Sequence, residues 1–341
     1  MTIPGALMQA EIAQAPGVFA RSLATSVSPP ARQALTALNL SEIRALYTIA
    51  RGSSDAAVNI LAYEFMRELG KPMTSLPPSV YSVGRGVSLT GCIVLIVSQS
   101  GASEDLVRSA QGARDSGATV IAITNQPGSS VEKLAHITLP IAAGSELAVP
   151  ATKTVIGSIA AGMALLSLLA PPYKPRADAA ARALLAVAGH RHPDATRITA
   201  ALVAASHVYI IGRDTGFGAA QELALKIKET CALHAEAYSS SEVLHGPLQL
   251  ATNPLLVLIL DTGQADVQAS LNTAEARFRA ISGNVFRLRP SDVGVDTADL
   301  TPAAAAALLL CLTYPMVLDT ALALGHDPDR PATLSKVTQT T

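Results

Sequence analysis

Short apolar runs alternate with helix-like segments along most of this chain. In the clearest run, residues 92–97, six apolar residues follow one another without a polar break, which is typical of a strand buried on both faces. Further strands are expected near 44–50, 72–76, 118–123 and 136–140, and then near 207–212, 234–238, 255–260 and 284–288. Helical patterns lie between them, at 54–69, 103–116, 130–135, 154–170, 217–231 and 302–323. This alternation predicts parallel sheets that are covered by helices on both faces.

The two halves of the chain resemble each other. Arg51-Gly52-Ser53-Ser54 opens a helix after the first strand, and the glycine-bounded run 212–216 does the same in the second half, which indicates a duplicated domain. We therefore expect an α/β fold with two similar doubly wound parallel-sheet domains, each built of three α/β/α layers. Their expected bounds are 37–172 and 195–325, after an N-terminal helical segment at 1–36 whose helix ends near Pro29 and before an irregular C-terminal tail at 326–341. The proline-rich run 171–175 marks the end of the first domain.

A polar turn follows the clearest strand. Ser98-Gln99-Ser100-Gly101 comes directly after the apolar run, and a helical pattern begins near residue 103. Hydroxyls, an amide and a glycine therefore lie between a buried strand and a helix N-terminus, where backbone N–H groups and the helix dipole favour an anion. The turn predicts a phosphate-bearing ligand at the carboxyl edge of a parallel sheet, although an ordinary capped turn has the same local pattern.

The composition and net charge argue against several kinds of binding partner. The chain has 341 residues, 49% of them hydrophobic and 15% charged, with a net charge of −1, which suits two domains with sizeable cores. No basic block or basic–aromatic stripe is present, so neither nucleic acid nor an anionic membrane is an expected partner. The three cysteines, at 92, 231 and 311, lie far apart in apolar surroundings and are expected to be buried free thiols in a reducing compartment. No Cys/His cluster has the spacing of a zinc site, and no metal is expected.

Two apolar stretches need an explanation other than a membrane. The stretches 155–170 and 303–318 are shorter than the roughly 20 residues that a membrane-spanning helix needs. We expect core helices buried between a sheet and a partner subunit, and their all-round apolarity indicates an oligomer. Residues 1–10 lack a basic segment followed by an apolar core, so we expect no secretory signal and a cytoplasmic location.

Six segments, in order, resemble one known family. They are 51–55 (Arg-Gly-Ser-Ser-Asp), 98–101 (Ser-Gln-Ser-Gly), 143–153, 224–229 (Ala-Leu-Lys-Ile-Lys-Glu), 234–247 and the tail phrase 334–338 (Leu-Ser-Lys-Val-Thr). Together they resemble the sugar isomerase (SIS) family, and specifically its double-SIS aldose–ketose branch. That branch includes the isomerase half of glucosamine-6-phosphate synthase and the stand-alone SIS-type glucosamine-6-phosphate deaminases.

Two features separate these two family members. The synthase carries an N-terminal glutaminase domain whose nucleophile is a cysteine directly after the initiator methionine. Here Thr2 follows Met1, and only the short segment 1–36 precedes the first expected SIS domain, so we expect no release of ammonia from glutamine. The Arg-Gly-Ser-Ser-Asp form of the first loop also resembles the deaminases more than the synthase.

The resemblance implies a substrate-binding set. By their positions in the family motifs, the phosphate or sugar contacts are Ser98, Gln99, Ser100, Ser103 and Ser54, with Ser53, Val149 and Thr152 as further contacts. For Ser53 and Thr152, helix capping is the alternative role. Ala151 replaces a hydroxyl residue that is common in the synthase, which puts one sugar hydrogen bond in doubt and indicates a shifted substrate preference.

The candidate base lies on a helix. Glu222, Lys226 and Glu229 are spaced i, i+4 and i+7 and therefore share one helix face, which by itself is typical of a solvated salt-bridge face. The resemblance implies instead that Glu229 is the catalytic carboxylate, moving a proton between C1 and C2 of the sugar. Lys226, one turn earlier, would orient Glu229 and the sugar.

Three further residues come from the resemblance. His245, followed by Gly246-Pro247, is the ring-opening candidate, and in relatives the matching histidine reaches the site from a neighbouring subunit, which implies a homodimer. His234 is a weaker candidate, expected to be a core residue that binds backbone groups. Lys336, in the tail, is expected to assist at the C2 carbonyl or its imine while the tail closes over the sugar.

The resulting hypothesis is an enzyme that deaminates and isomerises glucosamine 6-phosphate to fructose 6-phosphate. No cofactor is expected, because the open-chain aldehyde itself acidifies the C2 hydrogen. Three alternatives remain open at this point: a deaminase or deglycase for another amino sugar phosphate or a fructosyl-amine phosphate, a plain phosphosugar isomerase, and a sugar-phosphate sensor. The presence of Glu229, His245 and Lys336, and the lack of a helix-turn-helix segment before residue 36, argue against the sensor.

Overall fold

The computed structural model describes residues 3–281 and 283–336. These residues divide into two compact units, each built around one sheet. The five-stranded unit contains residues 17–146 and 153–181, and the four-stranded unit contains residues 3–16, 147–152 and 182–336. The chain thus interleaves the two units, whereas the sequence predicts continuous segments.

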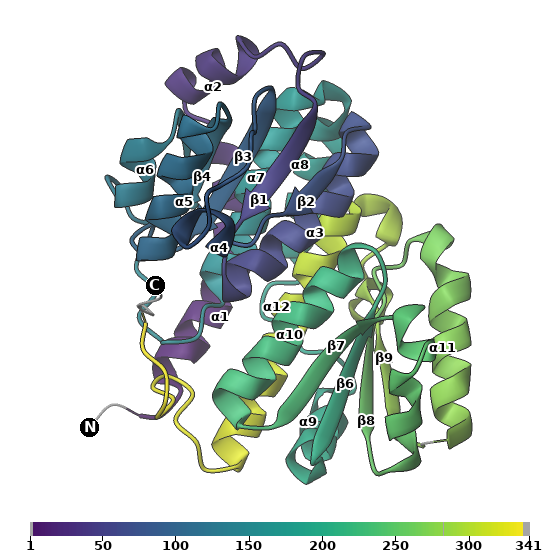
Figure 1. Cartoon of the computed structure of the whole chain (residues 1–341). Coiled ribbons are helices and arrows are strands. Elements are labelled where there is room, and N and C mark those ends of the chain that lie inside the picture. The colour runs from purple at the N-terminus through teal and green to yellow at the C-terminus, as the bar shows by residue number, and fades with distance from the viewer. Residues whose placement is uncertain (1–2, 282, 337–341) are drawn as a thin grey trace. The chain divides into compact units, whose positions relative to one another are not determined.

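The five-stranded unit is built on a parallel sheet in the order β2-β1-β3-β4-β5 (Figure 1). The strands are β1 (Ala45–Ile49), β2 (Met73–Ser75), β3 (Cys92–Ser98), β4 (Thr119–Thr124) and β5 (Ile137–Pro140). All seven residues of the central strand β3 are buried, as the unbroken apolar run predicts.

Helices cover both faces of this sheet. On one face, Val94 and Ile96 of β3 pack with α5 (Glu104–Asp115) and α6 (Ser130–Leu134), and α4 (Ser79–Ser82) packs beside α5. The opposite face carries α3 (Gly52–Leu69) and α7 (Lys153–Leu169), which contact β3 and β4 respectively. The remaining helices that contribute to this unit are part of α1 (Ala6–Thr25), α2 (Pro29–Thr36), the 3-10 turn Pro171–Tyr173 and part of α8 (Lys174–Ala186).

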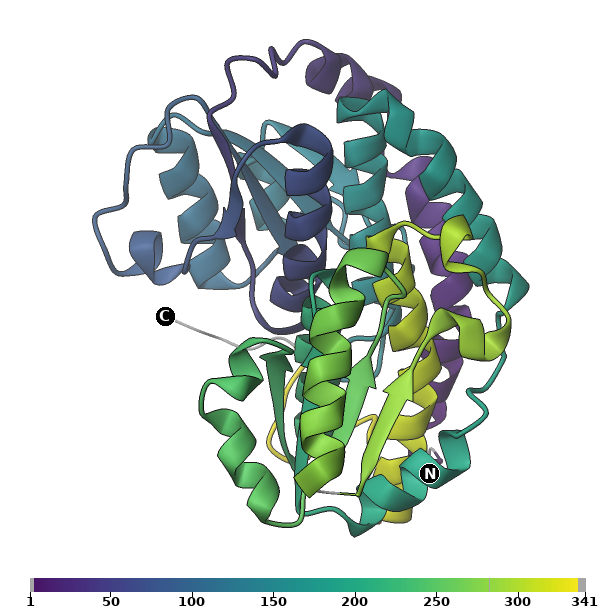
Figure 2. The ribbon, with the colours of Figure 1, turned by 90° about the vertical axis from the view of Figure 1, so that its right-hand side faces the viewer.

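The four-stranded unit repeats this plan. Its parallel sheet has the order β7-β6-β8-β9, with β6 (His207–Gly212), β7 (His234–Ser239), β8 (Leu256–Leu260) and β9 (Val285–Leu288). One face packs against α11 (Gln268–Ile281) and the 3-10 segments Glu242–Leu244 and Pro247–Thr252. The other carries α10 (Thr215–Cys231), which packs on α12 (Pro302–Ala323), and α9 (Ala195–Ala204) packs on α12 in turn. Figure 2 shows α11 lying along the sheet of this unit.

The two sheets share one topology, so the expected fold class of two similar three-layer domains is confirmed. The order β2-β1-β3-β4 corresponds strand by strand to β7-β6-β8-β9. In each sheet the connections leave two adjacent central strands in opposite directions, at β1 and β3 and at β6 and β8. Such a topological switch point opens a crevice at the carboxyl edge of a parallel sheet, where ligands of this fold class bind.

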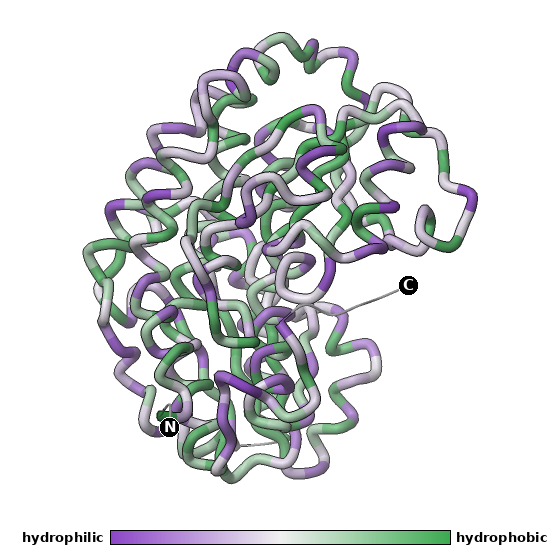
Figure 3. The backbone as a smooth tube through the Cα atoms, turned by 90° about the vertical axis from the view of Figure 1, so that its left-hand side faces the viewer, coloured by the Kyte–Doolittle hydropathy of each residue, from purple (hydrophilic) through white to green (hydrophobic). Residues whose placement is uncertain are grey.

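Several local expectations are wrong. The helical segment does not end near Pro29: Pro29 instead begins α2, with the Ser28 hydroxyl accepting from the Ala31 N–H at 3.4 Å, because proline suits the first helical turn. The sequence analysis also missed α4, α8, α9 and α11, whose apolar positions are interrupted by charged or small residues. Figure 3 shows this mixture of hydrophobic and hydrophilic residues along the helices.

The apolar helix α12 is a core element. With 22 residues it is long and apolar enough to cross a membrane, so the expectation that this stretch is too short is wrong, yet 78% of its apolar window is buried inside the protein. Its cover includes α9 and α10 of the same unit. The all-round apolarity of α12 therefore requires no partner subunit.

Candidate active site

The serine-rich loop 98–103 lies at the switch point of the five-stranded sheet. It connects β3 to α5, and β3 pairs with β1, whose own loop leads into α3. The Ser98 hydroxyl accepts from the Gly101 N–H at 3.1 Å, and the Ser100 hydroxyl accepts from the Ala102 N–H at 3.4 Å. The loop therefore folds on itself into a compact turn, beside the N-terminus of a 12-residue helix.

Gly101 is required by the shape of this turn. Its φ is +57°, and a Cβ at this position would lie 2.3 Å from the Ser129 hydroxyl oxygen. The Gly101 carbonyl also accepts from the Val131 N–H at 3.0 Å, which ties the loop to α6. A side chain at position 101 would push the loop away from Ser129 and from α6.

Gly101→Ala is expected to weaken binding of a phosphorylated sugar by about tenfold, because an L-residue in the left-handed region costs roughly 1–2 kcal/mol and the clash displaces the loop. Isothermal titration calorimetry with a sugar phosphate measures this. Gly128→Ala is the matched control, since Gly128 has φ +72° but open space around its Cβ. An equal loss of affinity in both variants would contradict a specific role of the loop.

Two helix N-termini converge at this edge. Ser103 is the N-cap residue of α5, and its side chain makes no capping hydrogen bond. Ser53 and Ser54 lie in the first turn of α3, whose N-cap residue is Arg51, so neither serine is the N-cap. The capping alternative for Ser53 is therefore not realised, and the hydroxyls of both loops lie where the dipoles favour an anion.

Arg51 is a site candidate that the sequence analysis missed. Its Nε donates to Asp105 Oδ2 at 2.9 Å, and the carboxylate of Asp105 is fully buried in the first turn of α5. The Arg51 side chain is 51% exposed, so it brings a cation to the mouth of the serine-rich loop. Arg51 directly follows a buried strand and lies in the first motif loop, and this position in the sequence could have identified it as a site residue.

The segment 147–152 belongs to the four-stranded unit, and its two predicted sugar contacts differ in exposure. Val149 is partly exposed, whereas Thr152 is fully buried. Just before the segment, Glu146 caps α7: it accepts from the Thr154 N–H at 3.1 Å and from the Thr154 hydroxyl at 2.6 Å. Val149 is thus the more accessible of the two predicted sugar contacts.

The helix face of α10 is not a solvated salt-bridge face. Lys226 is fully buried and forms ion pairs with both Glu229 and Glu222, its Nζ lying 3.7 Å from Glu222 Oε1. Glu222 is also fully buried, and its Oε1 accepts from the Tyr314 hydroxyl at 3.1 Å. Only Glu229 retains exposure, at 23% of its side chain. The arrangement fixes one accessible carboxylate against a buried ammonium.

The histidines lie elsewhere in the four-stranded unit. His245 is exposed and follows the 3-10 segment Glu242–Leu244, which packs on the same face of the sheet as α11. Since α10 and α11 belong to connections that run in opposite directions, they cover opposite faces, and the segments that carry Glu229 and His245 therefore lie on opposite faces of the sheet. His234 starts β7, is exposed and lies 3.2 Å from His207 (Nδ1 to Nδ1), so the prediction of a core histidine is wrong.

The tail residue Lys336 is ordered by the segment 147–152. Its Nζ donates to the Ala148 carbonyl oxygen at 2.6 Å, next to Val149. The tail from 326 to 336 contains no helix, as the sequence predicts, and residues 337–341, which include the rest of the tail phrase, lie outside the described residues.

The structure therefore groups the predicted residues into separate sets. Ser53, Ser54 and the loop 98–103 share the edge of the five-stranded sheet. In the four-stranded unit, Lys226 contacts Glu229, and Lys336 contacts the segment that carries Val149. His245 follows a segment on the other face of the four-stranded sheet from α10, the helix that carries Lys226 and Glu229.

The corresponding switch point of the four-stranded sheet holds a buried carboxylate followed by a threonine, Asp261-Thr262. Asp261 directly follows β8, as Gln99 follows β3, and is 1% exposed. It accepts from Arg287 Nε at 3.0 Å, Gln268 Nε2 at 2.8 Å and the Gly263 N–H at 2.8 Å. Burial, the largest single influence, would raise the pKa of Asp261, but the hydrogen bonds from Gln268 and Gly263 and the charge of Arg287 outweigh it and lower that pKa.

Asp261→Asn is expected to lower the free energy of unfolding by about 2 kcal/mol at neutral pH, because Arg287 is buried and loses a charged partner. Since folding lowers this pKa, the contribution is present above the unfolded-state pKa and is lost as pH falls through the folded-state value. Urea unfolding over a pH series measures it. The exposed Asp299→Asn is the control, and a pH-independent difference between wild type and Asp261→Asn would contradict the prediction.

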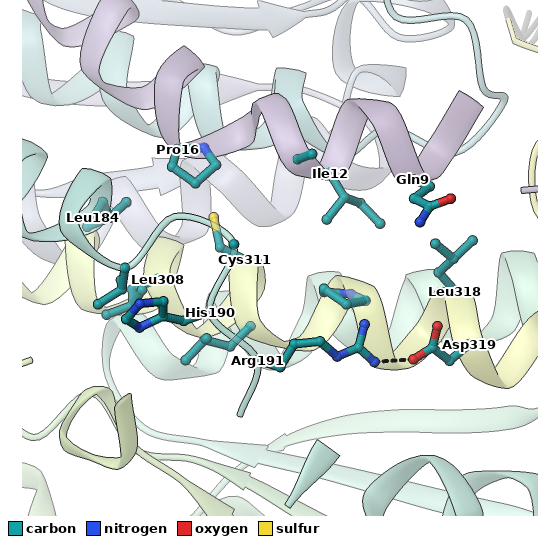
Figure 4. A pocket seen from close by; sticks show the side chains of 15 residues that line it. Gln9, Ile12, Pro16, Leu184, His190, Arg191, Leu308, Cys311, Leu318 and Asp319 are labelled. Carbon is teal, nitrogen blue, oxygen red and sulfur yellow. Dashed lines mark hydrogen bonds and ion pairs between the residues drawn. The ribbon is translucent and has the colours of Figure 1, made fainter. Parts of the chain in front are cut away.

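A separate apolar pocket lies between α1 and α12 (Figure 4). It encloses about 250 Å³, and an ion pair between Arg191 and Asp319 borders it. Pro16 and Pro315 both line it, inside their helices. Burial raises the pKa of the Cys311 thiol there to about 12, so the thiol is neutral. None of the predicted site residues lines this pocket.

The comparisons with known proteins agree with this topology. The profile of the SIS domain family matches residues 39–168 and 201–281. Among curated proteins, a glutamine–fructose-6-phosphate aminotransferase (isomerizing) of Aeropyrum pernix is 33% identical over 299 residues, covering 79% of this chain and 46% of the relative. The aminotransferase of Symbiobacterium thermophilum is 32% identical over 326 residues, covering 88% and 52%. This chain spans about half the length of these curated relatives.

Two solved structures extend the comparison. A protein of Silicibacter pomeroyi, provisionally described as a phosphosugar isomerase, has a TM-score of 0.83 and 33% identity, covering 96% of this chain and all of that protein. A glucosamine-6-phosphate deaminase of Thermotoga maritima has a TM-score of 0.72 at 20% identity, covering 98% of this chain. The second likeness shows a shared fold alone.

Proposed function

This chain belongs to the SIS domain family, and on that premise we propose that it is an enzyme that converts glucosamine 6-phosphate and water into fructose 6-phosphate and ammonia. The observation that carries the proposal is the accessible Glu229 carboxylate, fixed by the buried Lys226. A sugar-phosphate substrate is supported by the serine-rich loop and by the family. An amino sugar is supported by the similarity to aminotransferases that are named for fructose 6-phosphate.

The proposed reaction begins with phosphate binding at the switch point of the five-stranded sheet, through the loop 98–103 and Ser54. Glu229 then takes the proton from C2 of the open-chain sugar and returns it to C1. C2 is thereby oxidised to an imine while C1 is reduced to an alcohol, so electrons balance within the sugar. Water adds to the imine and ammonia leaves, assisted by Lys336 at C2.

The proposal assigns ring opening to His245 of the partner subunit in a homodimer. The segments that carry His245 and Glu229 cover opposite faces of the sheet within one chain, which supports a histidine supplied by a neighbouring copy. His245 is exposed and therefore available to a neighbour. We also place the enzyme in the cytoplasm, supported by the free state of Cys92, Cys231 and Cys311.

A plain phosphosugar isomerase is the second candidate, favoured by the similarity to the Silicibacter protein. Glu229 would perform the same proton transfer on an unaminated sugar, without hydrolysis of an imine. The two candidates differ in whether ammonia is formed.

The deciding experiment incubates the purified chain with glucosamine 6-phosphate and measures ammonia and fructose 6-phosphate together. Equal amounts of both products support the deaminase. Galactosamine 6-phosphate, a fructosyl-amine phosphate and unaminated hexose 6-phosphates are tested beside it. Conversion of only an unaminated sugar would establish the isomerase instead, and binding without turnover of any of these sugars would indicate a sensor.

A further inference from the structure

Buried carboxylates join three distant parts of the four-stranded unit: the start of α1, the segment 147–152 and the tail 326–336. Asp329, in the tail, is 3% exposed. Its carboxylate accepts from the Met8 N–H at 2.7 Å and from the Leu7 N–H at 3.0 Å, in the first turn of α1. A tail residue thus caps this helix, satisfying N–H groups that have no partner within it.

The second carboxylate lies one turn further along α1. Glu11 is 4% exposed and accepts from the N–H groups of Leu147 and Ala148, the latter at 3.3 Å to Oε2. The next N–H of the segment, that of Val149, donates to the Asp329 backbone carbonyl at 2.9 Å. Three successive N–H groups of the segment are therefore held by α1 and the tail.

Lys336 closes this arrangement. Its Nζ donates to the Ala148 carbonyl, so one face of the same short segment receives the tail ammonium while Glu11 holds its N–H groups. The packing is close: a Cβ at Gly5 would lie 2.9 Å from Leu318 and 3.2 Å from Pro328. Glu11 and Asp329 hold the N–H groups of residues 147–149, so a shift of α1 or of the tail backbone would also move the Ala148 carbonyl that binds Lys336.

The geometry points to Glu11 and Asp329 as positioning residues that set the place of the Lys336 ammonium and of Val149 at the substrate. Both are too buried to contact a sugar themselves and act through the segment 147–149. The kinetic part of this inference rests on the proposed function, in which Lys336 assists at C2. The positional part, the ordering of Lys336, does not.

The kinetic test is a set of double-mutant cycles. Glu11→Gln and Asp329→Asn each keep one acceptor oxygen on the side chain. Asp329→Ala keeps none and is compared with Asp329→Asn. Each is made in the wild type and in Lys336→Ala. We expect Asp329→Ala to lower kcat by about tenfold in the wild type but less than about twofold in Lys336→Ala, with KM little changed. Glu11→Gln is expected to follow the same pattern with a smaller loss, because its remaining oxygen can still accept. Asp329→Asn is expected to retain more activity than Asp329→Ala.

The control is Asp296→Asn, since Asp296 caps a short 3-10 helix of the same unit through the Ala298 N–H and, among the described residues, makes no hydrogen bond to the tail or to α1. It is expected to leave kcat unchanged in both backgrounds. Losses of kcat of equal size in wild type and Lys336→Ala would show that Glu11 and Asp329 act independently of the lysine, and would overturn the inference.

A chemical readout separates this inference from the proposed function. Lys336 and the exposed Lys228 are acetylated in the intact protein with a limiting active ester, and their relative rates are read by peptide mass spectrometry. We expect the ratio of Lys336 to Lys228 modification to rise several-fold in Glu11→Gln and Asp329→Ala, but not in Asp296→Asn. An unchanged ratio overturns the positioning role. A raised ratio in a protein that releases no ammonia from glucosamine 6-phosphate supports the positioning and rejects the deaminase.

Discussion

Replacing Glu229 with glutamine is expected to lower kcat for glucosamine 6-phosphate by about 10³-fold, within the range of a lost general base. The amide has nearly the shape of the carboxylate, so it preserves the contact with Lys226 but cannot accept the C2 proton. KM is expected to change little, because the proposed phosphate contacts belong to the loop 98–103. Steady-state kinetics with coupled detection of ammonia measure both constants.

The control for this result is Glu42→Gln, which makes the same chemical change at an exposed residue whose carboxylate accepts from the Asn39 amide at 2.7 Å. It is expected to retain wild-type kcat. Exchange of the C2 hydrogen with deuterated water gives a second readout, which is expected to stop in Glu229→Gln. Ammonia release at the wild-type rate by this variant would remove Glu229 from the mechanism.

Lys226→Met is expected to lower the free energy of unfolding by about 3 kcal/mol, because it removes the buried ammonium that pairs with the buried carboxylate of Glu222. Glu222 is fully buried and also accepts from the Tyr314 hydroxyl, a neutral donor that does not replace the charge of Lys226. Catalysis is expected to fall as well, since Glu229 loses the ammonium that orients it. Urea unfolding followed by circular dichroism measures the stability.

The matched control is Lys228→Met, on the same helix but exposed, which is expected to change stability by less than about 0.5 kcal/mol. Adding Glu222→Gln to Lys226→Met removes the buried carboxylate charge as well and is expected to recover part of the lost stability. If Lys226→Met and Lys228→Met unfold alike, the buried ion pair makes no net contribution to folding.

Much of the fold could be predicted from the sequence because its signals are local. Every expected strand matches an observed one within a few residues, since unbroken apolar runs such as 92–97 have only one way to bury both faces. The motif loops also lie where strand–turn–helix patterns place them, at the carboxyl edges of parallel sheets. Helices with mixed surfaces, such as α8 and α11, gave weaker patterns and were missed.

The candidate site was only partly predictable. The spacing of Glu222, Lys226 and Glu229 places them on one face of a helix, but only the packing of α12 against α10 shows that the first two are buried and the third is accessible. Arg51 appeared as part of a motif, while its ion pair with Asp105 joins residues 54 positions apart. The segments that carry His245 and Glu229 cover opposite faces of the sheet, which follows from the order of the strands and not from any local motif.

The sequence by itself determined the elements of this protein, the parallel sheets and the chemistry of the loops, because side-chain periodicity and turn composition act over a few residues. The tertiary structure alone decided which carboxylate of α10 stays accessible, and that Asp329 caps a helix 321 positions earlier in the chain while Glu11 holds Ala148, 137 positions later. Hydrogen bonds over such separations leave no periodic trace in the sequence. They form only once the sheets and their covering helices have brought those backbone groups out of water and close to one another.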